Sequence, residues 1–503
     1  MNKKNLSKPV IFFVFFLILG LLVFRDYGLS WDEPAQRKTG FIHLRHALKR
    51  DQLLSNYEDR DYGPAFEMGL TVIERVFNLK TNLRRLYLVR HLVTFLSFYS
   101  GLIFFYLLAK SFFKSSEIAL LGCFFLVISP RIFGHSFYNS KDLPFLSFFI
   151  ISVYTLRLFL DKKNLKSSLS HALACALLSS IRIAGLMVPL LTVFLFLWEL
   201  TLEQKNKKNK KIAPLLVFIF PTIFLTILFQ PFLWQNPVNH LLEILQQMNH
   251  FRWNQTVLYR GQFLRADNLP WHYLPVWIII TTPLLYLFLF LLGSWRLMRL
   301  ATKTKKRSWL KRDVFIFFLW FYLPLTGVIL SKSVLYDGWR HLFFIYPAFL
   351  LIALQGAVFF IKKSPYFLLL ILLGLIEPLL FMIKYHPYQN VYFNRLAGRN
   401  MKQVKDNFEL DYWGLSYRQA LEYILEHDQD KEIKVAVANA PGRINADLLV
   451  RGKERLVYVD QPEQAKYFLT NYRWHPQDYS YQNEFYVIKV GGAKIMVVYK
   501  IND

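Results

Sequence analysis

The chain has 503 residues, of which 54% are hydrophobic and 17% aromatic, with 48 Phe among them. This apolar content exceeds that of an ordinary soluble domain and predicts a polytopic membrane protein. The formal net charge of +27 does not indicate a nucleic-acid partner, because Lys and Arg form short clusters between apolar segments rather than one basic face. Cys123 and Cys175 both lie inside apolar stretches, which argues against a disulfide framework.

Apolar segments that could span a bilayer recur along the chain up to residue 383. The first follows Lys3, Lys4 and Lys8 and lacks a small-residue cleavage site, so it is predicted to be a retained span rather than a signal peptide. About eleven transmembrane helices are expected from this pattern. In chain order the segments are 9–24, 88–109, 117–134, 143–160, 169–185, 186–202, 212–232, 273–294, 313–330, 341–361 and 365–383.

Basic residues follow alternate spans and set the predicted orientation. By the positive-inside rule, the N-terminus lies in the cytoplasm and the C-terminus outside. The division at Gly185 matters here, because merging the two spans on either side would place the lysines after residue 204 on the wrong side. The clusters are Lys110 and Lys114, then Lys162, Lys163 and Lys166, then residues 205–211, then 296–312, then Lys362 and Lys363.

The tail after residue 383 changes to a soluble pattern. It predicts a helix at 416–427 and a small sheet, with a hairpin around Gly491-Gly492. The strands are expected at 433–437, 456–459, 466–469, 485–490 and 494–501. We therefore expect a transmembrane domain over 1–383, with a long outer loop at 25–87, and an extracytoplasmic α/β domain over 384–503. A role in acceptor binding and a role as a mere cover are both open for this domain.

Two adjacent acids, Asp32 and Glu33, stand in Ser30-Trp31-Asp32-Glu33-Pro34, directly after the first span. An unpaired acid drawn toward a bilayer is costly, so these side chains must lie in water, meet cations or line a polar cavity. A solvated acid pair in a loop is the plain alternative. The choice depends on the other polar groups on the same side of the membrane.

One such group lies at the outer ends of two spans, in the stretch from Ser129 to Pro144. Arg131 could simply reach the membrane–water interface with its long side chain. That explanation does not account for Asp142, which stands at the start of an apolar helix. A helix N-cap is the structural alternative for Asp142. The candidates in this stretch are Arg131, His135, Asn139, Lys141 and Asp142.

Two further groups of basic residues lie on the same predicted side. Arg182 is close to the outer end of the fifth span, where a guanidinium needs an anion, and pairing with Asp142 alone would satisfy it. Arg340 and His341 begin the tenth span, where anchoring in an aromatic belt is the alternative. Cations near an interface suit a phosphate, and acids beside them supply a general base or a metal ligand. The pattern predicts a site for a lipid-linked phosphate on the outer face.

On these residues the chain resembles the polyprenyl-phosphate-sugar dependent glycosyltransferases of the GT-C fold, in particular the protein O-mannosyltransferase and aminoarabinose-transferase-like group (family 39-like). The resemblance rests on the acid pair after the first span, the eleven-span frame, the motif Asn139-Ser140-Lys141-Asp142 and the Arg340 segment, and it covers about residues 9–400. The segments 387–394 and 411–414 look like those of bacterial members that have an outer C-terminal domain.

The resemblance implies inverting transfer of a sugar from a polyprenyl-phosphate donor to a hydroxyl of a glycolipid, glycan or protein, at the outer (periplasmic) face of a bacterial inner membrane. By analogy, Asp32 is the base and Glu33 positions the acceptor. Metal dependence is open, because O-mannosyltransferases use none, other GT-C enzymes bind a divalent cation, and no His or Cys spacing decides here. The donor phosphate is assigned to Arg131, Lys141, Arg182, Arg340 and His341, and the remaining site residues are Asp142, Asn139 and His135.

Two other functions compete with this one. A polytopic lipid or glycan transporter or flippase would also place ions within a membrane frame. A scaffold without activity would leave Asp32 and Arg182 without a role. The chain shows no internal repeat between its halves, and its ionic groups gather at one face rather than near the midplane, so an enzyme is the preferred interpretation.

Overall fold

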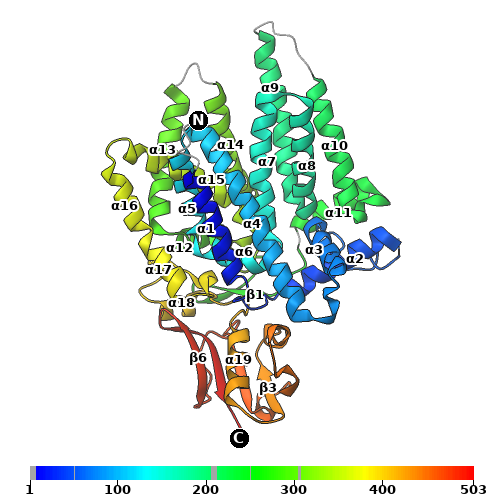
Figure 1. The fold of residues 1–503 in the computed structure, drawn as a ribbon, viewed down its shortest axis with the longest axis vertical. Coiled ribbons are helices and arrows are strands. Elements are labelled where there is room, and N and C mark those ends of the chain that lie inside the picture. Colours follow the sequence, from blue (N-terminus) through cyan, green and yellow to red (C-terminus); the bar gives the residue numbers. More distant parts are fainter. Residues whose placement is uncertain (1–6, 50, 206–211, 250, 304–307, 503) are drawn as a thin grey trace.

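A bundle of long helices stands above one small sheet domain in the computed structural model, which describes residues 7–49, 51–205, 212–249, 251–303 and 308–502 (Figure 1). Lys3, Lys4 and the lysines within 206–211 lie outside the described residues, as does the 304–307 part of the 296–312 cluster. The C-terminus lies at the far end of the sheet domain, and α1 begins at the opposite end of the molecule.

Helix covers each of the eleven segments that the sequence predicts as spans. Among the described residues, six helical stretches are long and apolar enough to cross a membrane, or up to eight if each bent pair counts as one span. α1, α8 and α10 are shorter, at 17 residues each. The protein is an integral membrane protein. The helices are α1 (Ser7–Val23), α4 (Leu83–Phe113), α5 (Ser116–Val127), α7 (Asp142–Lys162), α8 (Leu165–Ile181), α9 (Met187–Lys205), α10 (Ala213–Phe229), α12 (Tyr273–Thr281), α13 (Leu284–Lys303), α14 (Ser308–Leu330), α15 (Tyr346–Ile361), α16 (Tyr366–Gly374) and α17 (Ile376–Lys384).

Two of the predicted spans are not continuous. The chain bends by 71° between α5 and α6 (Pro130–Tyr138), and by 117° between α12 and α13. A proline causes each break, because Pro130 and Pro283 force the residue before them out of the helical region: Ser129 and Thr282 both have extended backbone. As a result α6 occupies most of the stretch between the predicted spans 117–134 and 143–160.

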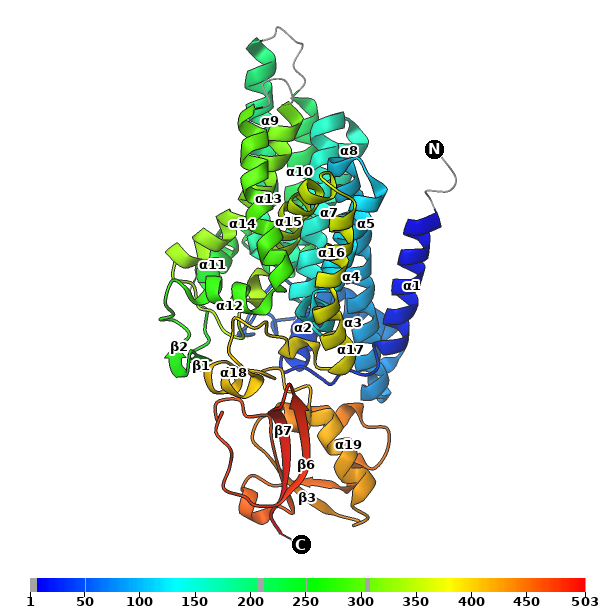
Figure 2. The same cartoon turned by 90° about the vertical axis from the view of Figure 1, so that its left-hand side faces the viewer.

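The division at Gly185 is confirmed. α8 ends at Ile181, the short η3 (Ile183–Leu186) follows, and α9 starts at Met187. The far ends of α7, α9 and α14 meet through ion pairs of Lys163 with Glu199 at 3.1 Å and of Arg312 with Asp161 at 2.7 Å. In Figure 2 these ends lie opposite the sheet domain, as the predicted orientation requires.

The loop between α1 and α4 folds into two helices, α2 (Glu33–Lys49) and α3 (Ala65–Val76). Arg90 of α4 is buried and pairs with Glu67 and with Glu74 of α3, the latter at 2.7 Å, which holds α3 against the bundle. The loop after α10 contains η4 (Pro231–Trp234), α11 (Pro237–Asn249) and the hairpin β1 (Thr256–Tyr259) and β2 (Gln262–Arg265).

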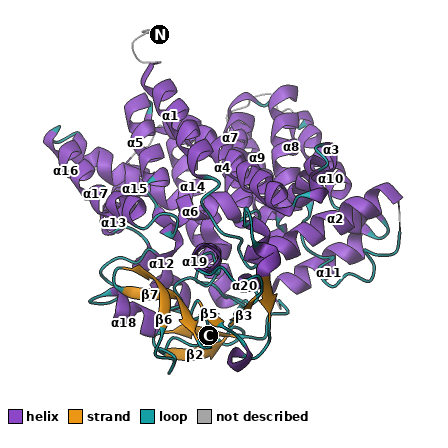
Figure 3. Ribbon diagram, turned by 60° about the horizontal axis from the view of Figure 1, so that its bottom comes forward, coloured by secondary structure: helices purple, strands orange, loops and turns teal. Residues whose placement is uncertain are grey.

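The C-terminal sheet has the strand order β4-β3-β5-β7-β6. β3 pairs in parallel with β4 and β5, and the antiparallel hairpin β6–β7 turns at Gly491-Gly492. Figure 3 shows these strands gathered at the face of the molecule that also holds α19 and the C-terminus. All five predicted strands and the predicted helix form. Their bounds are β3 (Ile433–Val437), β4 (Leu456–Tyr458), β5 (Tyr467–Thr470), β6 (Glu484–Val490), β7 (Ala493–Lys500), α18 (Met401–Asn407), α19 (Tyr417–His427) and α20 (Pro441–Ile444).

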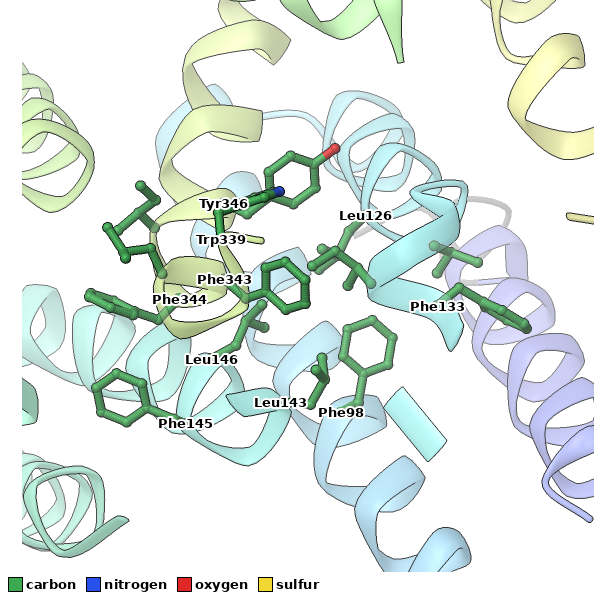
Figure 4. Close-up of a cluster of buried hydrophobic side chains, with 14 of the residues drawn as sticks. Phe98, Leu126, Phe133, Leu143, Phe145, Leu146, Trp339, Phe343, Phe344 and Tyr346 are labelled. Atoms are coloured by element: carbon green, nitrogen blue, oxygen red, sulfur yellow. The ribbon is translucent and has the colours of Figure 1, made fainter. Parts of the chain in front are cut away.

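A buried apolar cluster joins the segments from which the polar site is built (Figure 4). Its side chains come from α4, α5, α6, α7, α15 and from η5 (Arg340–Ile345), the turn that precedes α15. Leu143 and Phe343 are almost fully buried within it, and each lies close in sequence to a charged residue of the site. Close packing here fixes where Asp142 and Arg340 stand.

α13 and α15 approach closely at two glycines. A Cβ at Gly356 would overlap the Leu289 carbonyl oxygen of α13, and a Cβ at Gly293 would overlap the Ile352 carbonyl oxygen of α15. Small residues of this kind let membrane helices pack backbone to backbone.

We therefore expect Gly356→Ala to destabilise the protein by about 1–3 kcal/mol, because α13 and α15 must move apart. Gly69→Ala is the matched control, since Gly69 is a helical glycine of α3 with no atom within 4 Å of the added Cβ. Thermal unfolding of both variants in detergent checks this. Equal unfolding temperatures would contradict the close approach.

Candidate functional site

A cavity of about 460 Å³ lies between the long loop after α1 and the helices of the bundle. Its polar end is formed by loop residues and by the starts of α7 and η5. Its other walls are apolar and come from η3, α9, α11 and α14. The polar lining includes Asp32, Gln36, Asp61, Tyr62, Lys141, Arg182, Tyr336, Arg340 and His341, and the apolar lining includes Ile183, Met187, Ile244, Met248, Pro324, Val328, Leu342 and Phe344.

Arg340 is the centre of the polar end. Its guanidinium is 2% exposed and lies 3.0 Å from a carboxylate oxygen of Asp32, 3.1 Å from one of Asp142 and 3.2 Å from one of Asp337. The indole of Trp413 and the phenol of Tyr336 stack on it. A buried guanidinium needs this number of anions, and it holds three carboxylates from separate parts of the chain in one place.

Arg182, the residue after α8, approaches one of these carboxylates. It pairs with Asp142, so the pairing weighed from the sequence is present. Asp142 is the first residue of α7, yet its carboxylate does not cap the helix. The cap is supplied by Asn139, whose side-chain oxygen accepts from the Asp142 amide at 2.9 Å while its side-chain nitrogen donates to the Asp142 carboxylate at 2.9 Å.

Lys141 and His341 offer unpaired donors to the cavity. The Lys141 ammonium is buried and has no hydrogen-bond partner among the described residues, although it lies 3.1 Å from the centre of the Tyr62 ring. Burial, together with the charge of Arg182, lowers the pKa of Lys141 to about 7. Within the part of the chain that the structure describes, Nδ1 of His341 and Nε of Arg182 also have no hydrogen-bond partner. Buried donors that lack acceptors mark a place prepared for an anion.

Asp32 has an environment unlike that of an ordinary loop acid. Its side chain remains 32% exposed, which leaves it accessible from the cavity. Burial raises the pKa of the Asp32 carboxyl above its ordinary value, Arg340 opposes this rise, and Asp337 and Asp142 add to it. A carboxylate with a raised pKa is a better proton acceptor than a solvated one.

Glu33 does not line the cavity. Its carboxylate accepts from the Ser30 amide at 2.7 Å and from the Ser30 hydroxyl at 3.1 Å, and it lies 2.8 Å from Nε2 of the buried His91 of α4. These contacts close the turn that begins α2. Glu33, to which the resemblance assigns the positioning of the acceptor, therefore faces the helix bundle and not the cavity.

Arg131 and His135, both on α6, also lie outside the cavity wall. Nε of Arg131 donates to the Tyr392 carbonyl at 3.0 Å, and its guanidinium stacks on Phe393. His135 is fully buried and accepts from the Trp413 indole at 3.3 Å. The bend at Pro130 explains this placement, because it lays α6 against the segment that connects α17 to the sheet domain.

Several residues at the site are absent from the prediction. Asp337 contacts Arg340 directly, Tyr62 and Tyr336 line the cavity, and Trp413 and Arg473 reach the site from the C-terminal part. Asp337 stands next to a glycine just before a predicted span, which is a detectable signal. Arg473 gives only a weak signal in the sequence, because it is a single charged residue between Tyr472 and Trp474.

The loop that carries Asp32 is fixed from the other end of the chain. The side chain of Asn445 accepts from the Leu29 amide at 2.8 Å and donates to the Leu29 carbonyl at 3.0 Å. The Trp31 amide donates to the Trp413 carbonyl at 3.2 Å. Two segments of the C-terminal part therefore determine where the Asp32 turn lies.

A metal ion has no evident ligand set in the part of the chain that the structure describes. Within those residues, no group of three or more His, Cys, Asp or Glu side chains is arranged to hold one.

Comparison with known proteins identifies the class of fold. A family model described as dolichyl-phosphate-mannose-protein mannosyltransferase matches residues 71–229. That stretch runs from α3 to α10 and includes Lys141, Asp142 and Arg182. No curated protein matches the sequence. The fold is the GT-C fold, as the sequence resemblance predicted.

Two solved structures specify this further. They are crystal structures of ArnT from Cupriavidus metallidurans, one bound to undecaprenyl phosphate and one in the apo state. Each alignment covers 98% of this chain and 98% of the ArnT chain, with 13% sequence identity. The TM-scores are 0.51 for the bound structure and 0.52 for the apo structure. The whole chain, sheet domain included, therefore shares its fold with ArnT.

The two adjacent acids are expected to differ in their effect on stability. Glu33→Ala leaves the Ser30 amide and His91 without a partner in a buried place, which costs about 1–3 kcal/mol. Asp32→Ala leaves Arg340 with two carboxylates and costs less. Thermal unfolding of the two variants measures the difference. An equal loss for both would contradict the separate roles.

Proposed function

We propose that the protein is an inverting glycosyltransferase that moves a sugar from a polyprenyl-phosphate donor to an acceptor hydroxyl on the outer face of the membrane. The observation that carries the proposal is the cavity, which combines an accessible carboxylate, buried unpaired cationic groups and apolar walls. The family match and the ArnT fold agree with it. The acceptor is a hydroxyl of a glycolipid, a glycan or a protein.

The phosphate of the donor is assigned to the nitrogen-bearing side chains at the polar end. They are Lys141, Arg182, Arg340 and His341. Negative charge grows on the phosphate as the bond to the sugar breaks, so these groups stabilise the transition state more than the ground state. Arg131 and His135 are not part of this proposal, because neither lines the cavity.

The lipid chain is assigned to the apolar walls, where Met187 of α9 faces Pro324 and Val328 of α14. Gly327 lies on this side of α14, and a side chain there would meet no atom within 4 Å. A donor with a polar head and a long apolar chain fits a cavity that is polar at one end and apolar along the rest.

Asp32 is assigned as the general base. It takes the proton of the acceptor hydroxyl, the acceptor oxygen bonds to the anomeric carbon, and the bond from that carbon to the phosphate oxygen breaks. The phosphate leaves with the electron pair, and attack from the side opposite to it inverts the carbon. Asp32 must then come within hydrogen-bond reach, about 2.6–3.2 Å, of that hydroxyl.

The outer side is assigned to the periplasm of a bacterial inner membrane. The sheet domain lies at one end of the bundle, and the basic ends of α7 and α13 lie at the other. Arg340, which lines the cavity, contacts Trp413 and shares Asp337 with Arg473 of the C-terminal part. The positive-inside rule places the basic end in the cytoplasm. The donor is then used after it has reached the outer leaflet.

Asp32→Asn is expected to reduce sugar transfer by about 10²–10⁴-fold, the usual effect of removing a general base. The measurement uses membranes from cells that express each variant, labelled polyprenyl-phosphate sugars and a membrane-extract acceptor pool, with protein amounts matched by blot. Asp26→Asn is the control, because Asp26 is an exposed acid of the same loop whose partner is His386. Full transfer by Asp32→Asn would remove Asp32 as the base, and lipid movement without transfer would favour a transporter.

Phosphate binding is expected to weaken as the pH rises above about 7. The pKa of Lys141 is about 7 in the empty cavity, so above that pH the side chain must take up a proton to bind an anion. Calorimetry with polyprenyl phosphate across this range gives the affinity. Lys141→Arg stays charged and should show no such fall, so the same pH dependence in both proteins would contradict this role.

A further inference from the structure

One side chain of the sheet domain contacts the charged residues that surround Arg340. Arg473 follows β5 and is 8% exposed. Its guanidinium lies 2.8 Å from the Asp337 carboxylate, donates to the Tyr412 carbonyl, and stacks on Trp31, the residue before Asp32, with 5.1 Å to the ring centre. This arginine thus touches both a carboxylate bound to Arg340 and the turn that carries Asp32.

Charges alternate from one arginine to the next across the site. Arg182 pairs with Asp142, Asp142 with Arg340, Arg340 with Asp337, and Asp337 with Arg473. Asp32 joins this row at Arg340. Because Arg340 is shared, the strength of its bond to Asp32 depends on how well Asp337 is neutralised by another cation.

The backbone on both sides of the Arg473–Asp337 pair is strained. Asp337 has a φ of 57°, and Tyr472 and Trp474 each have a φ of 61°, although none of them is glycine. Side chains disfavour this left-handed region, and such residues persist where the surroundings impose them, often at functional sites. The chain therefore adopts an unfavourable conformation at Asp337 and at both neighbours of Arg473.

Glu409 lies beside Arg473 but does not compete for it. Both oxygens of the buried Glu409 carboxyl lack hydrogen-bond partners among the described residues. Burial raises the pKa of the Glu409 carboxyl, against the opposing effect of Arg473, and so disfavours the charged form of this group. The positive charge of Arg473 is then available to Asp337.

We propose that Arg473 is a positioning residue of the transfer reaction: it neutralises Asp337, and so leaves the Arg340 guanidinium to hold Asp32 ionised and in place. The inference rests on the proposed function and gives the sheet domain a part in it. Arg473 touches no reacting atom itself. It acts through Asp337 and Arg340.

Removing Arg473 changes the charge that Asp32 experiences. Arg473 lowers the pKa of Asp32 and Asp337 raises it, so loss of the arginine leaves an extra negative charge and moves the acid limb of the activity profile to higher pH. When both Arg473 and Asp337 are replaced by neutral residues, their opposite effects on the pKa of Asp32 approximately cancel. The charged and titratable groups that face Asp32 are Arg340, Asp337, Asp142, Arg473, Tyr62 and Tyr336, with Lys141, Arg182 and His341 in the same cavity.

The test measures the pH dependence of sugar transfer for wild type, Arg473→Gln, the double variant Arg473→Gln/Asp337→Asn and Arg443→Gln. Arg443 is the control, an exposed arginine of the same domain paired with Asp460. Arg473→Gln should lower kcat at neutral pH about tenfold and move the acid limb up by about one pH unit, with little change in the donor KM. The double variant should return the acid limb of the pH profile toward its wild-type position. Arg443→Gln should match wild type over the whole pH range.

The outcomes separate the inference from the function. If wild type transfers sugar and Arg473→Gln keeps the wild-type acid limb, the inference is overturned while the proposed function stands. If Arg473→Gln does not accumulate in cells, the double variant decides between the outcomes. An acid limb at the wild-type pH supports the charge balance between Arg473 and Asp337. An acid limb displaced from the wild-type pH overturns the inference. If wild type transfers no sugar from any donor, the proposed function falls, and the inference falls with it.

Discussion

A guanidinium buried at the end of a membrane helix is stable only among anions, and Arg340 meets this condition with Asp32, Asp142 and Asp337. The three acids come from the first outer loop, from α7 and from the loop after α14. A carboxylate buried in this place without a cation would destabilise the fold. Their common dependence on one cation brings distant parts of the sequence to a single point and forms the polar end of the cavity.

The helices around this point are arranged to leave room for it. Pro130 and Pro283 end α5 and α12 early, and the chain turns sharply after each. The bends keep long helices from filling the space above the sheet domain. Apolar packing of Leu143 and Phe343 then fixes the bases of the charged segments (Figure 4). The cavity is thus bounded by rigid elements on most sides, which suits a site that must hold charges in a set geometry.

The sequence predicts the elements well and the contacts less well. Hydrophobic length and alternation are local, so the apolar helices and the five strands are recognised from Phe-rich runs and from alternating runs such as Ile433–Val437. Asp32, Lys141, Arg182 and Arg340 are recognised because a charge near a bilayer needs a partner. The direction of a side chain is not local. Glu33 stands beside Asp32 in sequence, yet the start of α2 turns it toward His91, and Arg473 reaches the site only through the docking of the sheet domain.

The hydrogen bonds between Leu29 and Asn445 join residues 416 positions apart. During synthesis the loop of Asp32 emerges early, whereas Asn445 and Trp413 emerge near the end. The nascent chain therefore holds the turn of Asp32 without its final supports until the C-terminal part has been made and has folded. A chain that ends before Asn445 therefore lacks the hydrogen bonds that hold the backbone of Leu29 next to the Asp32 turn.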